Sequence, residues 1–346
     1  CVHPHNAPIA DVAVEKLLQK KFHKTMGLDL EFFDGLVKKS AGAVQDALKQ
    51  AKPVTHIGTG QAKVDQVASN RRIIGPDGKI KYWRGSAAKE ANLHAEPEGL
   101  IDPWLKTLSF WNGETPLAAL SYYATHPMSY YGDGRVNPDF AGFARIKRQA
   151  EMPGVFQMYF NGCGGNIAPG KYNNGAHENR PVLRDRIYDG MVQAWSETKQ
   201  HPVTECTWRS VPLTLDVRRD PEFTPEYARK VYEQAEKFEG AIGHAVMKMA
   251  WADRRDRPID LSCLDLGVAE VVHLPGEPFV EYQLFAQSLR KDGFVCVAGY
   301  GDGGPGYIPT EKAYSEGGYE TTVAYTGPES EQILKGAIAD AMKRSP

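Results

Sequence analysis

The chain has 346 residues, a formal net charge of −2 and 24% charged side chains, which is enough for a globular protein with a sizeable hydrophobic core. Its lysines and arginines form no dense block, so the sequence lacks the electrostatic signature of a protein that binds nucleic acid or an anionic membrane surface. It also contains no apolar stretch of the roughly 20 residues that a transmembrane helix needs. We therefore expect neither a nucleic-acid partner nor a membrane-spanning segment.

Helices and strands are predicted to alternate in the first half of the chain. Apolar residues recur at helical spacing over Glu31–Gln50, ahead of Pro53. An extended segment over Val54–Val67 follows, and a turn signal at Gly75–Gly78 begins a long surface excursion to about Asp102. The other elements predicted here are a β-hairpin around Asn112-Gly113 with strands Leu105–Phe110 and Leu117–Thr125, a short helix over Phe143–Gln149, a buried strand over Val155–Phe160 and a helix over Pro181–Ser196.

The second half of the chain continues without a strict βαβ rhythm. Its predicted elements are a strand over Thr207–Val217, a charged helical region over Pro225–Arg254, a strand over Leu266–Leu274, a helix over Pro278–Arg290, a strand over Phe294–Ala298 and a closing helix over Pro328–Lys343. This order predicts an α/β fold, a layered domain with mixed β-sheets flanked by helices. We expect residues 1–346 to form a single domain of this kind.

The five cysteines are widely spaced and include no C-x-x-C pair. A thiolate zinc site is therefore not expected, and most of these residues are predicted to be buried free thiols, with one disulfide left open. The chain starts at Cys1 and without a methionine. An N-terminal cysteine can act as a nucleophile, but a chain end produced by truncation or processing is the simpler interpretation.

Polar side chains of metal-binding type follow four predicted strand ends. His3 and His5 lie two residues apart, and because such residues share one side of a strand, we expect both imidazoles to face one cleft. His126 ends the strand that begins at Leu117, Glu277 follows an apolar run, and the glycine-rich run 299–307 follows another. Histidine and carboxylate are the ligands of catalytic zinc sites, so the pattern predicts a mononuclear zinc hydrolase.

Taken in order, these motifs resemble the catalytic domain of the neutral/alkaline (non-lysosomal) ceramidase family. The matching segments are His3-Pro4-His5-Asn6-Ala7-Pro8, Val64-Asp65 with Asn70-Arg71, His126-Pro127-Met128-Ser129-Tyr130, Asp139-Phe140-Ala141-Gly142, Pro275-Gly276-Glu277 and Tyr307–Tyr314. The resemblance implies one catalytic domain that lacks the family's upstream strand segment and its C-terminal immunoglobulin-like domain. It also suggests a secreted or periplasmic setting.

The resemblance further implies a set of site residues. Zn²⁺ is expected to be held by His3, His126, Glu277 and Tyr307. His5 is expected to carry a proton or to bind the substrate, the alternative being a structural partner of the ligands.

Two further residues of the matched motifs receive expected roles. Arg71 and Tyr307 are expected to stabilise the oxyanion, although Arg71 alone would also fit a surface salt bridge. Asp139 is expected either to orient a histidine ligand or to cap the helix that follows it.

One loop departs from the family pattern. The family's Gly-Asp-Val-Ser-Pro-Asn loop aligns with Gly165–Gly170, where Ala168 replaces the serine implicated in ceramide hydrolysis and Asn166 replaces the aspartate. A mechanism that needs this hydroxyl is therefore not expected. Cys163 lies close by in the sequence and is a candidate substitute nucleophile, but a small buried thiol is the favoured interpretation.

Together these features predict a zinc-dependent hydrolase that cleaves an N-acyl amide bond by metal-activated water. The expected substrate is a small N-acylated molecule, either a lipid or a polar amide. We favour a polar one, such as an acylated amino sugar or amino acid, because the charged segment 72–102 offers little contiguous apolar surface. The alternatives are a metal-dependent esterase, lactonase or sugar deacylase, and a non-catalytic metal- or carbohydrate-binding protein. The sequence does not predict the oligomeric state.

Overall fold

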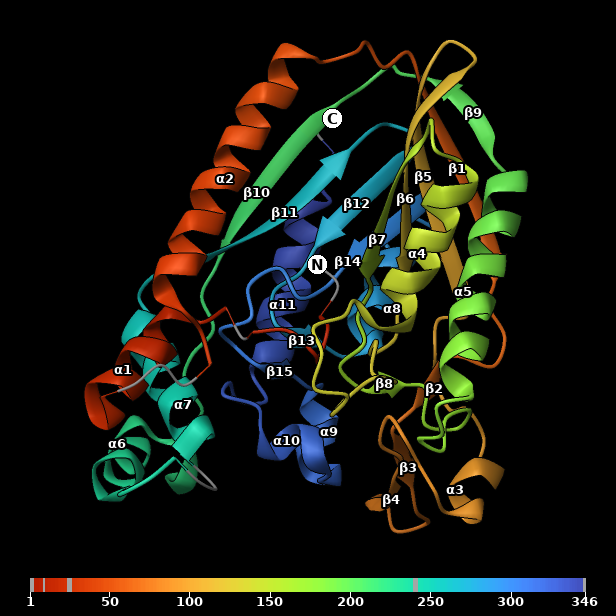
Figure 1. Cartoon of the computed structure of the whole chain (residues 1–346). Coiled ribbons are helices and arrows are strands. Elements are labelled where there is room, and N and C mark those ends of the chain that lie inside the picture. Colours follow the sequence, from red (N-terminus) through yellow and green to blue (C-terminus); the bar gives the residue numbers. More distant parts are fainter. Residues whose placement is uncertain (1–2, 9, 24–26, 239–241, 345–346) are drawn as a thin grey trace. The chain divides into compact units, whose positions relative to one another are not determined.

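The computed structural model describes residues 3–8, 10–23, 27–238 and 242–344 (Figure 1). The chain divides into two compact units. The first comprises Cys1–Asn6, Val54–Asp216 and Arg257–Pro346, and the second comprises Ala7–Pro53 and Val217–Asp256. The hypothesis that Cys1 is a nucleophile lies outside the described residues.

The first unit contains a five-stranded mixed sheet in the order β7-β6-β5-β1-β9. Its strands are β1 (His56–Lys63), β5 (Trp104–Asn112), β6 (Thr115–Tyr123), β7 (Phe156–Asn161) and β9 (Lys199–Pro202). The predicted hairpin is confirmed as β5–β6, and β7 runs parallel to β6. Helices α4 (Asp139–Glu151) and α5 (Asn179–Ser196) cover one face through a core that includes Phe140, Leu183 and Ile187.

A second sheet of the first unit packs on the other face. Its order is β10-β11-β12-β14, with strands β10 (Thr207–Leu213), β11 (Ile259–Asp265), β12 (Ala269–His273) and β14 (Phe294–Ala298). Ile57 and Leu108 of the first sheet join Val271 and Cys296 of the second in one buried cluster. Helix α8 (Val280–Ser288) links the parallel strands β12 and β14, and α11 (Ser330–Ala341) packs on β10 and β11. The predicted α/β fold with mixed sheets flanked by helices is therefore confirmed.

Short elements surround the strand ends of the first unit. Three two-stranded pairs are formed by β2 (Ser69–Asn70) with β8 (Ile167–Ala168), β3 (Arg72–Ile74) with β4 (Ile80–Trp83), and β13 (Glu277–Pro278) with β15 (Tyr307–Ile308). The short helices are α3 (Ala91–Ala95), α9 (Glu311–Glu316) and α10 (Tyr319–Thr322). These pieces hold the loops in which the predicted site residues lie.

The second unit is helical. It contains α1 (Val12–Phe22), α2 (Leu30–Lys49), the 3₁₀ turn η1 (Pro221–Phe223), α6 (Pro225–Gln234) and α7 (Ile242–Arg254). Val14 and Leu18 of α1 pack against Val246 and Ala250 of α7. Helix α2 matches the predicted helix, and its N-terminus is capped by the Asp29 carboxylate, which accepts a hydrogen bond from the Phe32 N–H.

Several predictions need correction. His3–Asn6 is an irregular loop and not a strand end, and His3 itself has a left-handed backbone with φ 45°. Strands β9 and β11 and helix α1 were not predicted, whereas the helical region predicted over Pro225–Arg254 is confirmed as α6 and α7. The segment that leads to Asp102 does not lie wholly on the surface. Its Arg84 guanidinium is buried and donates hydrogen bonds to the carbonyls of Asn70, Leu93 and Pro97.

Among the described residues Cys163, Cys206, Cys263 and Cys296 are all free thiols, and all but Cys206 are buried. None of the helices in the described ranges is both long enough and apolar enough to cross a lipid bilayer.

The interface between the two sheets should dominate the stability of the first unit. Leu108→Ala removes a completely buried side chain there and should lower the free energy of unfolding by about 2–5 kcal/mol. The matched control is Leu100→Ala, because half of the Leu100 side chain is exposed. Urea denaturation of both variants measures the difference, and equal losses would contradict the assigned core.

Candidate functional site

The residues predicted to bind a metal lie together in the first unit. Glu277 Oε2 is 3.1 Å from His126 Nε2 and 3.4 Å from His3 Nε2. The Tyr307 hydroxyl is 3.2 Å from the same His126 nitrogen. His126 follows β6, Glu277 and Tyr307 lie in the short strands β13 and β15, and His3 lies in the N-terminal segment.

A two-residue parallel bridge sets Glu277 beside Tyr307. The two are paired directly in the β13–β15 register, and the Glu277 N–H donates a hydrogen bond of 2.8 Å to the Gly306 carbonyl. The bridge requires glycine at position 276. Gly276 has φ 61°, and a Cβ there would lie 2.6 Å from the Gly306 oxygen.

Backbone carbonyls determine which nitrogen of His126 carries its proton. His126 Nδ1 lies 2.6 Å from the Gly164 oxygen and 3.1 Å from the Ile167 oxygen, so this nitrogen must donate a hydrogen bond. Burial lowers the pKa of His126, which keeps the ring neutral. Nε2 therefore presents a lone pair toward Glu277, in the orientation typical of a metal-binding histidine.

The carboxylate that faces this lone pair is ionised. Burial alone would raise the pKa of Glu277, but attraction and hydrogen bonds from His3 and His126 outweigh burial and lower it, which requires a proton or another positive charge on the nitrogens that face the carboxylate. An unprotonated nitrogen and a carboxylate oxygen only 3.1 Å apart repel each other unless a proton or a cation lies between them. The donor set, two imidazoles, a carboxylate and a phenol, fits zinc.

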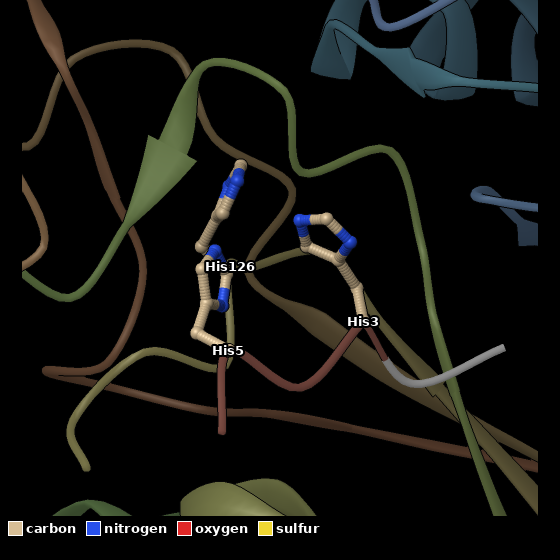
Figure 2. A group of neighbouring side chains, drawn as sticks. All are labelled: His3, His5 and His126. Carbon is tan, nitrogen blue, oxygen red and sulfur yellow. The ribbon is translucent and has the colours of Figure 1, made fainter. Parts of the chain in front are cut away.

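His5 lies against the same group. The imidazoles of His3, His5 and His126 face one another (Figure 2), and each of them can offer a nitrogen such that all three atoms lie within 4.8 Å. Burial, reinforced by His126 and His3, lowers the pKa of His5 to about 3. Its Nδ1 is buried and has no hydrogen-bond partner among the described residues. His5 is thus a neutral imidazole that can accept a proton or compete with Glu277 for a metal.

Arg71 is buried, so the surface salt bridge considered from the sequence is wrong. Arg71 directly follows β2, and the pairing of β2 with β8 places its side chain in the site. Its Nη1 donates to the Tyr307 hydroxyl at 3.0 Å and to the Gly165 carbonyl at 3.3 Å. Burial by itself would lower the pKa of Arg71, but Tyr307 and the buried Glu320 outweigh it and raise the pKa. The guanidinium therefore stays charged beside the phenol.

Sequence reasoning missed three residues that complete the site. Tyr300 stacks on His3 with ring centroids 4.3 Å apart, and its buried hydroxyl has no partner among the described residues. Glu320 forms ion pairs with Arg71 and Arg72 and accepts from the Trp83 indole N–H at 2.9 Å. Tyr300 follows a predicted strand in a glycine-rich run, which was a usable signal, whereas nothing in the local sequence marks Glu320 or Trp83.

Backbone strain concentrates around the site. Among the described residues five non-glycine positions have positive φ, and three of them, His3, Asp139 and Tyr300, belong to these loops. Asp139 contacts no predicted ligand. Its carboxylate accepts from the N–H groups of Ser129 and Tyr130, so it holds the loop after His126 and does not orient a histidine.

The loop that departs from the family pattern is buried. Ala168 is fully buried in β8, and its carbonyl accepts a hydrogen bond of 2.7 Å from the Ser69 hydroxyl. Cys163 is also fully buried, and burial raises the pKa of its thiol well above the usual value. The thiol therefore stays protonated, which is the inert state expected of a structural cysteine.

The fold is that of the neutral ceramidases, as the motifs indicated. The crystal structure of neutral ceramidase from Pseudomonas aeruginosa matches 95% of this chain with a TM-score of 0.61 and 15% sequence identity. A ceramidase in complex with C2 matches 83% of the chain with a TM-score of 0.58 and 15% identity. The chain covers 63% and 53% of the length of these two structures. No protein-family model and no curated protein matches the sequence.

The bridge between Glu277 and Tyr307 should tolerate no side chain at position 276. Gly276→Ala forces an unfavourable φ and a contact with the Gly306 oxygen, and it should lower the free energy of unfolding by about 1–3 kcal/mol. Gly42→Ala is the matched control, because it lies in α2 with no atom within 4 Å of the added Cβ and should be neutral or stabilising. Thermal denaturation compares the two, and a neutral Gly276→Ala would contradict the described bridge.

Proposed function

We propose that the protein is a zinc-dependent hydrolase that cleaves N-acyl amide bonds. The observation that carries the proposal is the contact of 3.1 Å between His126 Nε2 and the Glu277 carboxylate in a largely buried site, where backbone carbonyls hold the proton of the ring on Nδ1 and leave Nε2 without one. A divalent cation would relieve this repulsion, and His3 and Tyr307 lie within reach as further ligands.

The metal and the chain have separate tasks in this proposal. When bound, zinc makes water a better nucleophile at neutral pH and polarises a substrate carbonyl. The chain supplies the charged guanidinium of Arg71, which lies 3.0 Å from the Tyr307 hydroxyl. Together these two groups can bind the carbonyl oxygen as it gains negative charge.

His5 is the proposed proton carrier. Its ring is neutral, its Nδ1 is unpartnered, and it lies against the candidate ligands with its ring centroid 4.7 Å from that of His3. Because the pKa of His5 is only about 3, the ring is neutral near pH 7 and would hold a proton only in passing, between the water that loses it and the leaving amine that gains it.

The choice of an amide substrate rests on the fold. Both structures that the chain resembles are described as ceramidases, and ceramide is an N-acyl amide. A fold can serve several chemistries, so the substrate must be tested directly, with esters, lactones and acylated sugars beside amides.

The metal should be lost when a ligand is removed. His126→Ala and Glu277→Gln should each weaken zinc binding by more than roughly 10–100-fold. That smaller loss is typical when the changed residue does not bind the metal but hydrogen-bonds to a ligand. His5→Ala should keep the metal, and His201→Ala on β9 is a histidine control away from the proposed ligands. Elemental analysis of purified, folded variants gives the zinc content per chain. Zinc that survives Glu277→Gln and disappears in His5→Ala would show a three-histidine site and refute the proposed ligand set.

Hydrolysis should need the metal and not a thiol. A chelator should abolish release of the amine from simple N-acyl amides, and added zinc should restore it. Alkylation of the exposed Cys206 should leave the rate unchanged, and so should Cys163→Ser, since that thiol is buried and protonated. Turnover that resists chelation, or that Cys163→Ser abolishes, would overturn the proposal.

A further inference from the structure

A pocket of about 730 Å³ lies beside the candidate site, within the first unit. Residues from three segments line it, among them Trp83, Ser86, Tyr131, Asp133, His177 and Arg180. Its walls contact the site on two sides. The Tyr131 ring is 6.2 Å from the His5 ring, and the Arg71 guanidinium lies 4.7 Å above the Trp83 ring.

The pocket walls combine exposed aromatic rings with polar groups. Tyr131 is 68% exposed and Trp83 is 37% exposed, so part of each aromatic side chain is accessible to a ligand. Ser86 is more than nine-tenths buried, and its hydroxyl has no hydrogen-bond partner among the described residues. A buried hydroxyl without a partner is unfavourable unless water or a ligand satisfies it.

One wall holds an acidic side chain between two arginines. The Asp133 carboxylate accepts from Arg180 Nη1 at 2.9 Å and from Arg135 Nε at 2.7 Å. Arg180 also donates to the Ser129 carbonyl and lies 4.2 Å above the Tyr130 ring. Because these side chains are already held in place, a ligand that bonds to them loses little side-chain entropy.

This combination favours a hydroxyl-rich ring over an alkyl chain. A sugar ring has an apolar C–H face that packs on aromatic side chains and hydroxyls that both donate and accept. Those hydroxyls match the acceptor Asp133, the donor Arg180 and the unpartnered Ser86 hydroxyl. A lipid tail would desolvate the same groups without replacing their hydrogen bonds.

We propose that this pocket binds the sugar half of the substrate and that the substrate is an N-acylated amino sugar. The inference rests on the proposed amide hydrolysis, because the pocket adjoins His5 and Arg71. It deepens that function by naming the substrate class and the residues that select it, Tyr131, Ser86 and Asp133.

Binding tests the pocket without requiring turnover. Methyl N-acetylglucosaminide is titrated into the full chain by NMR, beside N-acetylbutylamine and N-acetylglycine as probes with the same acyl group. The sugar should bind best, and Tyr131→Ala should weaken it about tenfold, as expected for loss of one stacking ring. Ser86→Ala should weaken it severalfold. Tyr227→Ala on α6 removes another exposed tyrosine, one that does not line the pocket, and should leave the affinity unchanged.

Turnover then separates the two proposals. For the wild-type chain, kcat/KM should be higher for the N-acetyl amino sugar than for N-acetylbutylamine or a long-chain ceramide, and Tyr131→Ala should raise KM for the sugar with little change in kcat. Sugar binding that depends on Tyr131 without hydrolysis of any amide would refute the hydrolase and keep the pocket. Amide hydrolysis that prefers ceramide or N-acetylglycine, with sugar affinity unaffected by Tyr131→Ala, would overturn the pocket assignment and keep the hydrolase.

Discussion

The site depends on one unfavourable contact, an ionised carboxylate that faces an unprotonated imidazole nitrogen. Removing the Glu277 carboxylate from water costs several kcal/mol, and the lone pair of His126 adds repulsion at 3.1 Å. The carbonyls of Gly164 and Ile167 keep that lone pair in place, because they accept the hydrogen bond of the only N–H of the ring at Nδ1. This contact therefore lowers the stability of the folded chain, and it holds His126 Nε2 and Glu277 Oε2, two electron-rich atoms, where a cation would bind.

Close backbone packing makes this contact possible. The end of β7 meets the end of β14, where the Gly299 N–H donates to the Asn161 carbonyl at 2.9 Å, so the strand ends of both sheets converge. A Cβ at Gly165 would lie 2.4 Å from the Glu277 carbonyl oxygen, so the loop after β7 can approach β13 only as glycine. The glycine-rich runs, which superficially resemble phosphate-binding loops, serve this close approach.

Local sequence patterns predicted much of this arrangement. The apolar periodicity of α2 and the turn signal of the β5–β6 hairpin correspond to the structure because both are encoded by neighbouring residues. The proximity of His126 and Glu277 could be predicted only from ordered motifs, and their tautomer and charge depend on carbonyls far away in sequence. Glu320 could not be predicted, since its role comes from Arg71 and Arg72 across the fold. The strand predicted at His3 is wrong. Residues two apart share one side of a strand, but an irregular loop can also bring two imidazoles together, as it does for His3 and His5.

The buried state of position 168 bears on how such a site would work. Ala168 is a fully buried residue of β8, pairs with Ser69 of β2 and offers no functional group, so any chemistry must come from other side chains of the site. His5, Arg71 and Tyr307 supply a neutral base, a fixed cation and a phenol within one cluster. The same cluster opens toward Trp83 and Tyr131, whose rings border a polar pocket. Under the proposed function, such a site would select a substrate by the polar group beside the amide, because the unpartnered Ser86 hydroxyl lies there.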